Sequence, residues 1–325
     1  MTILLYLALS LIGFVLLFLG AEWLVRGSSS LARSLGIRPI IIGLTVVAFG
    51  TSAPELVVSI ISSIKGNSMI AVGNIVGSNI CNIALILGLA ASFRPLTTHY
   101  TVISRDIPIM LVISAFLLAI SMDSMLGRME GMVMLIGIFL YTLYNYNNAR
   151  RESLYRQFTS EAHIEKVEGH VRTRGKQYTF IIVGLIGVVV GAEIVVDSAV
   201  VIMTMLGASE KFIGLTIVAF GTSLPELATS VVAAIRKELD ISVGNLVGSN
   251  VFNILSVLGT ASLIRPIKIT GGFVDSGLYI DYLVMIFISA LPWVFMRKTR
   301  TISRFEGAIL LSSYIGYISF LVIKH

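Results

Sequence analysis

Two glutamates stand inside apolar segments of the chain, each in nearly the same context. Glu55 ends the string GTSAPE, and Glu226 ends the string GTSLPE 171 positions later. A carboxylate in the middle of a membrane span is costly, so such a residue usually serves the passage of an ion or a polar substrate. Helix packing does not require a carboxylate. Both glutamates are therefore expected to carry the chemistry of this protein.

The same contexts supply further oxygen atoms. Thr51 and Ser52 precede Glu55, and Pro54 is expected to leave backbone carbonyls unpaired about one turn earlier, because proline has no amide hydrogen. Thr222 and Ser223 repeat this arrangement before Glu226. The following strings, VGNIVGSNICNI from 72 and VGNLVGSNVFNI from 243, add hydroxyl and amide groups at Asn74, Ser78, Asn79 and Asn82, and at Asn245, Ser249, Asn250 and Asn253.

These ligand types select a class of ion. Carboxylate, hydroxyl, amide and carbonyl oxygens suit Ca²⁺ or Na⁺, whereas zinc and copper prefer sulfur and imidazole. Mg²⁺ is disfavoured because it gives up its water reluctantly. Two carboxylates balance the charge of one Ca²⁺ or two Na⁺. An empty site would hold two bare charges and should resist crossing the membrane, which is what obligatory exchange requires.

The chain consists of two copies of one unit. Residues 43–60 and 214–231 share GLT, VAFGTS and PEL at matched positions, and the same offset aligns 72–88 with 243–259. The copies are expected at 1–148 and 178–325. Residues 149–177 between them are polar and too few to fold alone. They are expected to form a linker loop within one integrated transport domain.

Composition places the protein in a membrane. The 325 residues are 56% hydrophobic and only 13% charged, with a mean hydropathy of +0.91. Spanning helices need about 20 apolar residues. The pattern predicts an all-α membrane protein with ten spans, at 3–25, 39–64, 68–93, 106–121, 129–148, 178–196, 211–235, 241–264, 279–296 and 303–323. The single cysteine excludes an intramolecular disulfide.

The basic residues predict an orientation. Eighteen of the 24 lysines and arginines follow odd-numbered spans, which puts those loops on the cytoplasmic side. Both termini are then outside and the 149–177 loop is cytoplasmic, in a multi-pass protein of the cell (inner or plasma) membrane. Because each copy has five spans, the second copy enters the membrane upside down. This is the inverted-topology repeat of many secondary transporters.

Glycine and proline interrupt the same spans in both copies. Gly43, Gly50 and Pro54 fall in the second span, and Gly73, Gly77 and Gly88 in the third. Their counterparts fall in the seventh and eighth spans. We therefore expect broken second, third, seventh and eighth helices. Such matched interruptions are the best sequence indication of a transporter binding site.

With these motifs in view, the chain resembles the cation/calcium exchanger superfamily, in particular prokaryotic sodium/calcium exchangers. The resemblance rests on GTSAPE with GNIVGSNICNI and on GTSLPE with GNLVGSNVFNI, and it extends over all ten spans. It implies four core helices in each half around the ion site. It also implies that the first and sixth spans slide past this core to alternate access.

The resemblance implies a set of ligands. Ca²⁺ would be held by the carboxylates of Glu55 and Glu226 and the carbonyls of Thr51 and Thr222. The flanking Na⁺ positions would use the Ala48 carbonyl, Thr51 and Ser78 on one side, and the Ala219 carbonyl, Thr222 and Ser249 on the other. Ser52 and Ser223 would assist, and Asn82 would face the centre. Some members of the superfamily carry aspartate where this chain has Asn253, so a third carboxylate is lacking here.

The leading hypothesis is an antiporter, and not an enzyme, that exports Ca²⁺ by using inward Na⁺. Exchange of Ca²⁺ for H⁺ on the same scaffold is the alternative, and a cation channel is a third possibility. Channels typically surround the pore with several subunits, whereas here one chain supplies both halves. The ions are substrates, and the sequence requires no cofactor, nucleic acid or protein partner besides the lipid bilayer.

Overall fold

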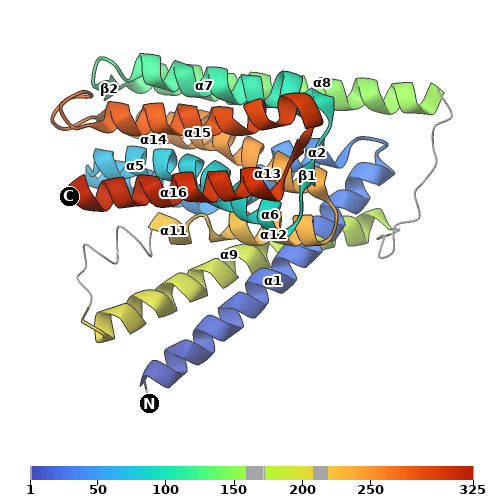
Figure 1. Cartoon of the computed structure of the whole chain (residues 1–325), viewed down its shortest axis with the longest axis horizontal. Coiled ribbons are helices and arrows are strands. Elements are labelled where there is room, and N and C mark those ends of the chain that lie inside the picture. The colour runs from blue at the N-terminus through green and yellow to red at the C-terminus, as the bar shows by residue number, and fades with distance from the viewer. Residues whose placement is uncertain (1, 159–170, 172, 208–218, 325) are drawn as a thin grey trace. The chain divides into compact units, whose positions relative to one another are not determined.

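The computed structural model describes residues 2–158, 171, 173–207 and 219–324, most of them in helices (Figure 1). The chain divides into two compact units. Unit 1 comprises residues 1–51 and 145–245, and unit 2 comprises residues 52–144 and 246–325. Each unit therefore takes segments from both copies of the sequence repeat. The division into 1–148, 149–177 and 178–325 stays a prediction.

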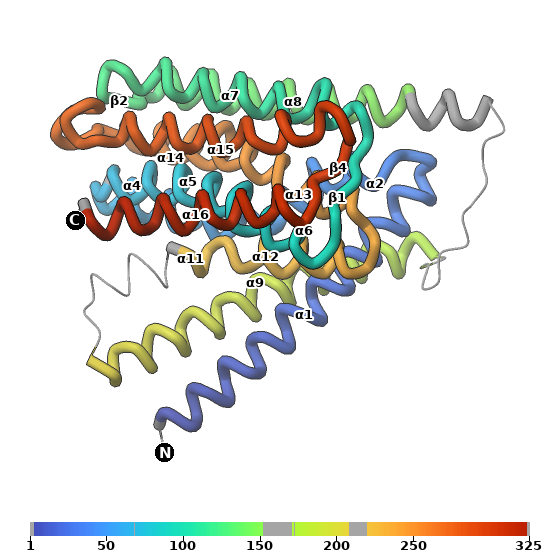
Figure 2. Tube along the Cα trace, viewed as in Figure 1, coloured from blue at the N-terminus to red at the C-terminus, as the bar shows by residue number. Residues whose placement is uncertain are grey.

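Unit 1 is built around two long helices that run side by side, α1 (Thr2–Ser34) and α9 (Arg174–Met205) (Figures 1 and 2). Its other elements are α2 (Pro39–Ile42), the π-helix η1 (Gly43–Val47), α3 (Ala48–Thr51), the last part of α8 (Arg128–Phe158), α11 (Ala219–Gly221), α12 (Leu224–Ile235) and the first part of α13 (Leu239–Phe252).

Glycines bring the backbones of α1 and α9 into contact. A Cβ atom added to Gly184 would lie 2.5 Å from the amide nitrogen of Leu24, and one added to Gly20 would lie 2.6 Å from that of Val188. No side chain fits at such distances. Small residues allow this close approach between helices in membranes, where dispersion contacts take over from the hydrophobic effect.

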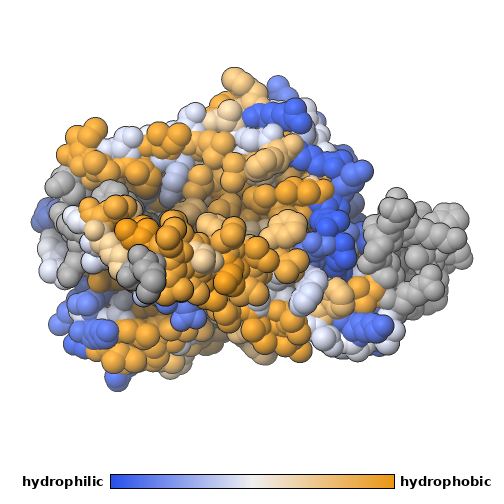
Figure 3. Space-filling model, turned by 90° about the horizontal axis from the view of Figure 1, so that it is seen from below, coloured by the Kyte–Doolittle hydropathy of each residue, from blue (hydrophilic) through white to orange (hydrophobic). Residues whose placement is uncertain are grey.

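The outer surface of α1 is apolar. Leu4 is 71% exposed and Leu11 is 66% exposed, and the face of the molecule seen in Figure 3 is dominated by hydrophobic residues. A surface of this kind suits contact with lipid chains.

Unit 2 holds the remaining helices and two short sheets. Its elements are α4 (Ala53–Lys65), α5 (Ser68–Ile80), the π-helix η2 (Cys81–Leu87), α6 (Gly88–Phe93), β1 (Leu96–Thr97), the π-helix η3 (Val102–Asp106), α7 (Ile107–Ile120), β2 (Met125–Leu126), the first part of α8, the last part of α13, the π-helix η5 (Asn253–Leu258), α14 (Gly259–Ile264), β3 (Ile267–Lys268), α15 (Leu278–Thr299), β4 (Thr301–Ile302) and α16 (Arg304–Lys324).

In unit 2, contacts occur in matched pairs: each contact has a counterpart in which the two copies of the repeat have interchanged roles. Strand β1 pairs antiparallel with β4, and β2 pairs antiparallel with β3. Each pair joins the end of the third span of one copy to the start of the fifth span of the other. The glycines repeat this relation, because Gly88 lies against Gly307 and Gly131 lies against Gly259. The internal symmetry of the sequence is therefore present in the packing.

The helical, membrane-embedded character predicted from the sequence is confirmed. Among the described residues, seven helices are long and apolar enough to span a membrane, or eight if Pro39–Thr51 and Ala53–Lys65 form one bent span. The number ten stays a prediction. Helix α8 continues to Phe158, past its expected end at 148. Parts of two predicted segments lie outside the described part of the chain. These are residues 208–218, in and before the predicted seventh span, and residues 159–170 and 172 of the predicted linker.

Among the described residues, the second and seventh spans are broken, next to Pro54 and Pro225, whereas α15 of the ninth span continues through Pro292. The second span is interrupted at Ser52, and the seventh at Thr222 and Ser223. The third and eighth spans run without a break from Ser68 to Phe93 and from Leu239 to Ile264, so the predicted breaks there are wrong. Glycine keeps its amide hydrogen and costs a helix only about 1 kcal/mol, whereas proline removes a donor and clashes with the preceding turn. In place of breaks these spans contain the π-helices η2 and η5.

Candidate functional site

The two glutamates occupy equivalent and fully buried positions. Glu55 lies in the first turn of α4 in unit 2, and Glu226 lies in the first turn of α12 in unit 1. In each case the helix begins with a proline, Pro54 or Pro225, in its first two positions. The amino end of a helix carries partial positive charge, which stabilises a carboxylate in its first turn. The fold thus offsets part of the cost of burying each charge.

Unit 1 shows how the break arises at Glu226. Helix α11 ends at Gly221, and α12 restarts with the amide of Leu227 donating to the Ser223 carbonyl at 3.0 Å. Pro225 has no amide hydrogen to donate to the carbonyl of Gly221. Thr222 and Ser223 fill the gap between the helices and are buried. Carbonyl and hydroxyl oxygens therefore gather where the carboxylate begins the next helix.

The other predicted ligands of unit 1 lie on short helices. Ala48 and Thr51 are the first and last residues of α3, and Ala219 begins α11. The Thr51 hydroxyl lies 3.1 Å from Asn245 Oδ1 and 3.4 Å from the Ala48 carbonyl. Asn245 Nδ2 donates to Ser230 Oγ at 3.1 Å. Because its amide nitrogen is engaged by Ser230, Asn245 presents its oxygen to Thr51.

Unit 2 brings together ligands from both copies of the repeat. Ser78 lies in the last turn of α5, about one helical turn before Asn82 in η2. Ser249 and Asn253 lie at the matching places of α13 and η5. All four are buried. In three of these four residues a buried oxygen has no hydrogen-bond partner among the residues that the structure describes, namely Ser78 Oγ, Asn82 Oδ1 and Asn253 Oδ1. Buried acceptors without partners are rare in proteins and call for an explanation, such as an ion.

The predicted site residues thus fall into two groups. Unit 2 contains Ser52, Glu55, Ser78, Asn82, Ser249 and Asn253, whereas unit 1 contains Ala48, Thr51, Ala219, Thr222, Ser223 and Glu226. That both groups act on the same ions stays a prediction.

The donor set agrees with the ion class expected from the sequence. No group of three or more histidine, cysteine, aspartate or glutamate side chains suited to a metal occurs among the residues that the structure describes. The predicted ligand side chains that precede the glutamates in the sequence, Thr51, Ser52, Thr222 and Ser223, are buried hydroxyls. This chemistry favours hard cations that accept neutral oxygen ligands.

Two further asparagines belong with these residues although the implied ligand set omits them. Asn79 and Asn250 are buried and form hydrogen bonds with Asn253 and Asn82, respectively. The available signal was the string GSN, which occurs in both copies and is separated from the ligand asparagine by two residues. Their partners depend on how α5 and α13 face each other, which the sequence does not specify.

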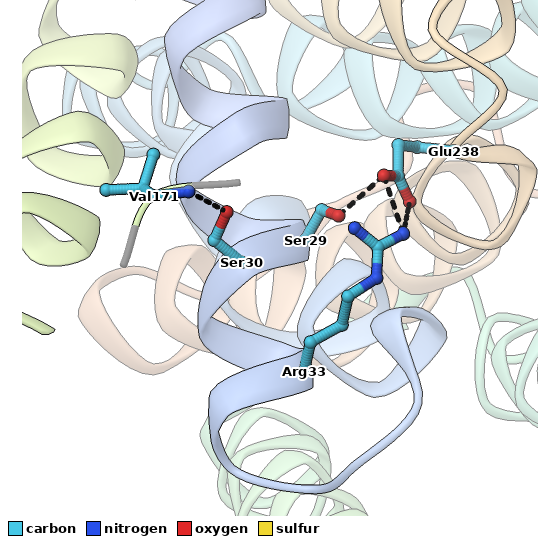
Figure 4. Close-up of polar contacts among 5 residues, drawn as sticks. All are labelled: Ser29, Ser30, Arg33, Val171 and Glu238. Carbon is cyan, nitrogen blue, oxygen red and sulfur yellow. Dashed lines mark hydrogen bonds and ion pairs between the residues drawn. The ribbon is translucent and has the colours of Figure 1, made fainter. Parts of the chain in front are cut away.

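A second polar cluster lies in unit 1, on the last turns of α1 (Figure 4). Glu238, in the turn between α12 and α13, accepts hydrogen bonds from Ser29 Oγ at 2.6 Å and from the Arg33 guanidinium at 2.8 and 3.1 Å. Two turns earlier, Glu22 forms ion pairs with Arg26 and Arg236. These contacts fasten α1 to the α12–α13 turn.

Replacing Glu238 by glutamine is expected to destabilise the protein by ~1–2 kcal/mol, because Arg33 loses its charged partner at a site only partly open to water. The loss should shrink as salt is added. Thermal unfolding can be followed by thiol-reactive dye labelling of Cys81, the single and buried cysteine. Lys237→Gln, an exposed position in the same turn, is the control and should leave stability unchanged. Equal stability of both variants would contradict the prediction.

Comparison with known proteins agrees with these observations. The family described as "Sodium/calcium exchanger protein" matches residues 5–147 and 176–323. The chain is 38% identical to the inner membrane protein YrbG of Escherichia coli K12, over 97% of this chain and 96% of that protein. It is 32% identical to the sodium/calcium exchanger MaX1 of Methanosarcina acetivorans, over 95% and 96% of the two chains.

A solved structure shares the fold. The sodium-calcium exchanger NCX_Mj, soaked with 2.5 mM Na⁺ and 0.1 mM Ca²⁺, superposes with a TM-score of 0.82 at 33% identity and covers 97% of this chain and 98% of that one. With its apolar helices and these relatives, the protein is a multi-pass membrane protein. The family matches both copies of the repeat, including both glutamate motifs and both asparagine motifs. The chain therefore belongs to the sodium/calcium exchanger protein family.

Proposed function

We propose that this protein is a secondary active antiporter that exchanges Ca²⁺ for Na⁺ by alternating access. One observation carries the proposal: a fully buried glutamate lies in the first turn of a helix that has proline within its first two positions, directly after a break, and this arrangement occurs twice. Family membership supports cation/Ca²⁺ antiport as the general activity. Na⁺ as the coupling ion is supported by the names of the relatives MaX1 and NCX_Mj.

The proposed ion site uses both copies. Glu55 and Glu226 hold Ca²⁺ with the carbonyls of Thr51 and Thr222, and Na⁺ occupies flanking positions. The other proposed ligands are Ala48, Ser52, Ser78 and Asn82, with their counterparts Ala219, Ser223, Ser249 and Asn253. The partnerless oxygens of Ser78, Asn82 and Asn253 support this assignment, because a cation would satisfy them.

Charge links the two fluxes. Two carboxylates balance one Ca²⁺ or two Na⁺, and Asn253 adds no further charge. Without ions, the site carries two negative charges in a region of low dielectric, where an unpaired charge is costly. The empty carrier therefore switches its ion site only slowly from one side of the membrane to the other, so that Ca²⁺ crosses only when Na⁺ crosses in the opposite direction.

The proposed architecture has ten spans in two inverted five-span repeats. The exchanged strand and glycine pairs of unit 2 support the repeat. The basic residues support a cytoplasmic 149–177 loop with both termini outside. An inner-membrane location is supported by the name of the E. coli relative.

The test is Ca²⁺ flux into vesicles that contain the purified protein. Vesicles loaded with Na⁺ and diluted into Na⁺-free buffer should take up ⁴⁵Ca²⁺, and the uptake should saturate. Vesicles with equal Na⁺ on both sides, and protein-free vesicles, should show none. A K⁺ gradient in place of Na⁺ should give no uptake.

Two results would redirect the proposal. Uptake driven by a pH gradient alone, without Na⁺, would identify a H⁺/Ca²⁺ antiporter. Ca²⁺ conductance without any cation on the opposite side would identify a channel. A saturable flux that requires Na⁺ excludes both.

A further inference from the structure

Four buried asparagines of unit 2 form a closed hydrogen-bond network. Asn79 and Asn82 lie at the junction of α5 with the π-helix η2, and Asn250 and Asn253 lie at the junction of α13 with η5. None is more than 1% exposed. Both pairs therefore stand at a change from α to π geometry, a local irregularity that is frequent at functional sites.

The inner pair is locked reciprocally. Asn79 Nδ2 donates to the backbone carbonyl of Asn250 at 3.3 Å, and Asn250 Nδ2 donates to the backbone carbonyl of Asn79 at 3.2 Å. With both amide nitrogens engaged across the helix pair, the side-chain oxygens of Asn79 and Asn250 are turned to accept hydrogen bonds from elsewhere.

The outer pair takes its orientation from the inner pair. Asn82 Nδ2 donates to Asn250 Oδ1 at 3.0 Å, and Asn253 Nδ2 donates to Asn79 Oδ1 at 3.1 Å. A flipped Asn82 amide would place its oxygen against that of Asn250 and lose this bond. The network therefore holds Asn82 and Asn253 with their oxygens as the remaining acceptors, and both of these oxygens are without a hydrogen-bond partner in the described part of the chain.

We infer that Asn79 and Asn250 are positioning residues, which act through Asn253 and Asn82 to keep two neutral carbonyl oxygens directed to a hard cation. This inference rests on the proposed exchange of Ca²⁺ for Na⁺ and deepens it by adding two residues to the machinery of the site. Neither asparagine contacts the ion. Each of them fixes which end of the partner amide, that of Asn253 or Asn82, faces the ion. An amide nitrogen that faced the ion in place of the oxygen would repel it.

The inference is tested by equilibrium binding of ⁴⁵Ca²⁺ to the purified full-length protein. Asn250→Ala should raise the dissociation constant about tenfold, because the Asn82 amide loses the acceptor that orients it. Asn82→Ala should have a similar effect. The variant that combines Asn250→Ala with Asn82→Ala should bind Ca²⁺ about as weakly as Asn82→Ala alone, since Asn250 acts through Asn82. Asn250→Ala combined with Asn253→Ala, which are not bonded to each other, should approach a hundredfold loss.

A merely structural role predicts a different pattern. It would lower the temperature at which Cys81 becomes accessible to a thiol dye, but leave Ca²⁺ affinity unchanged in the folded protein. Ser262→Ala is the control for deleting a buried polar group, since the Ser262 hydroxyl donates to the Leu258 carbonyl at 2.7 Å. It should bind Ca²⁺ as the wild type does. Affinity within twofold of the wild type in Asn250→Ala, or additive effects in the bonded pair, would overturn the inference.

Variants that keep the acceptor cover the case in which the alanine variants do not fold. Asn79→Asp and Asn250→Asp each retain an oxygen opposite the partner amide, so they should bind Ca²⁺ no more than about threefold more weakly than the wild type. A tenfold loss in them overturns the inference. The proposed function fails separately, if wild-type vesicles show no Na⁺-dependent Ca²⁺ uptake although the purified protein binds Ca²⁺.

Discussion

Replacing either Glu55 or Glu226 by glutamine is expected to abolish Ca²⁺ exchange while the protein remains folded. Glutamine keeps the shape of the side chain and one oxygen but removes the charge. Ca²⁺ would then face a single carboxylate and retain an unbalanced positive charge in the interior. Leaving a buried charge without its partner costs about 3–5 kcal/mol, which corresponds to a loss of affinity of at least about a hundredfold.

The measurement is Na⁺-dependent ⁴⁵Ca²⁺ uptake into vesicles, together with thiol labelling of Cys81 to show that each variant is folded. Glu193→Gln is the matched control, because Glu193 lies in the apolar helix α9 but is exposed. It should transport at the wild-type rate. Because Glu55 and Glu226 belong to equivalent contexts, both variants must fail. Exchange retained in either one would refute the assignment of both carboxylates to one ion.

Adding a methyl group at Gly184 is expected to be the most damaging change in the packing of unit 1. The new Cβ of Gly184→Ala would lie 2.5 Å from the Leu24 amide nitrogen and 2.8 Å from the Gly20 carbonyl oxygen. Both atoms belong to the backbone, so α1 and α9 must separate. Overpacking of a tight interface costs ~1–3 kcal/mol, and the lost contacts along the two helices add to it.

Thermal unfolding followed by Cys81 labelling measures this loss. Gly316→Ala is the control, because no described atom lies within 4 Å of a Cβ at that position of α16. Alanine also favours a helix over glycine by about 1 kcal/mol, so the control should be as stable as the wild type or slightly more so. If Gly184→Ala unfolds at the same temperature as Gly316→Ala, the glycines do not determine how closely α1 and α9 approach.

The strongest features of the fold and site were predictable because they change the chemistry of the backbone or bury a charge. Pro54 and Pro225 remove an amide donor, and the helices break next to them. Glu55 and Glu226 stand out because a carboxylate is exceptional in an apolar segment, and both are fully buried. These signals come from the residue itself and do not depend on its neighbours in space.

Other features depend on geometry that the sequence does not reveal. The glycines of the third and eighth spans predicted breaks, but the amide hydrogen of glycine lets the helix continue, and π-helices appear there instead. Residues 149–158 are polar and indicate a loop, although their arginines and leucine favour helix and α8 includes them. The roles of Asn79 and Asn250 follow from the register between α5 and α13, which only the folded structure gives.

The strand pairs of unit 2 have a consequence for biogenesis. Strand β1 is made at Leu96 and Thr97, but its partner β4, which comprises Thr301 and Ile302, follows only after a separation of 204 residues between Thr97 and Thr301. Contacts between segments so distant along the chain form late, since the intervening chain must first be inserted into the bilayer. The first-made helices of unit 2 must therefore wait in the lipid, incompletely partnered, until the chain has been made as far as β4. A chain cut short before β4 would leave them in that state and expose them to membrane quality-control proteases.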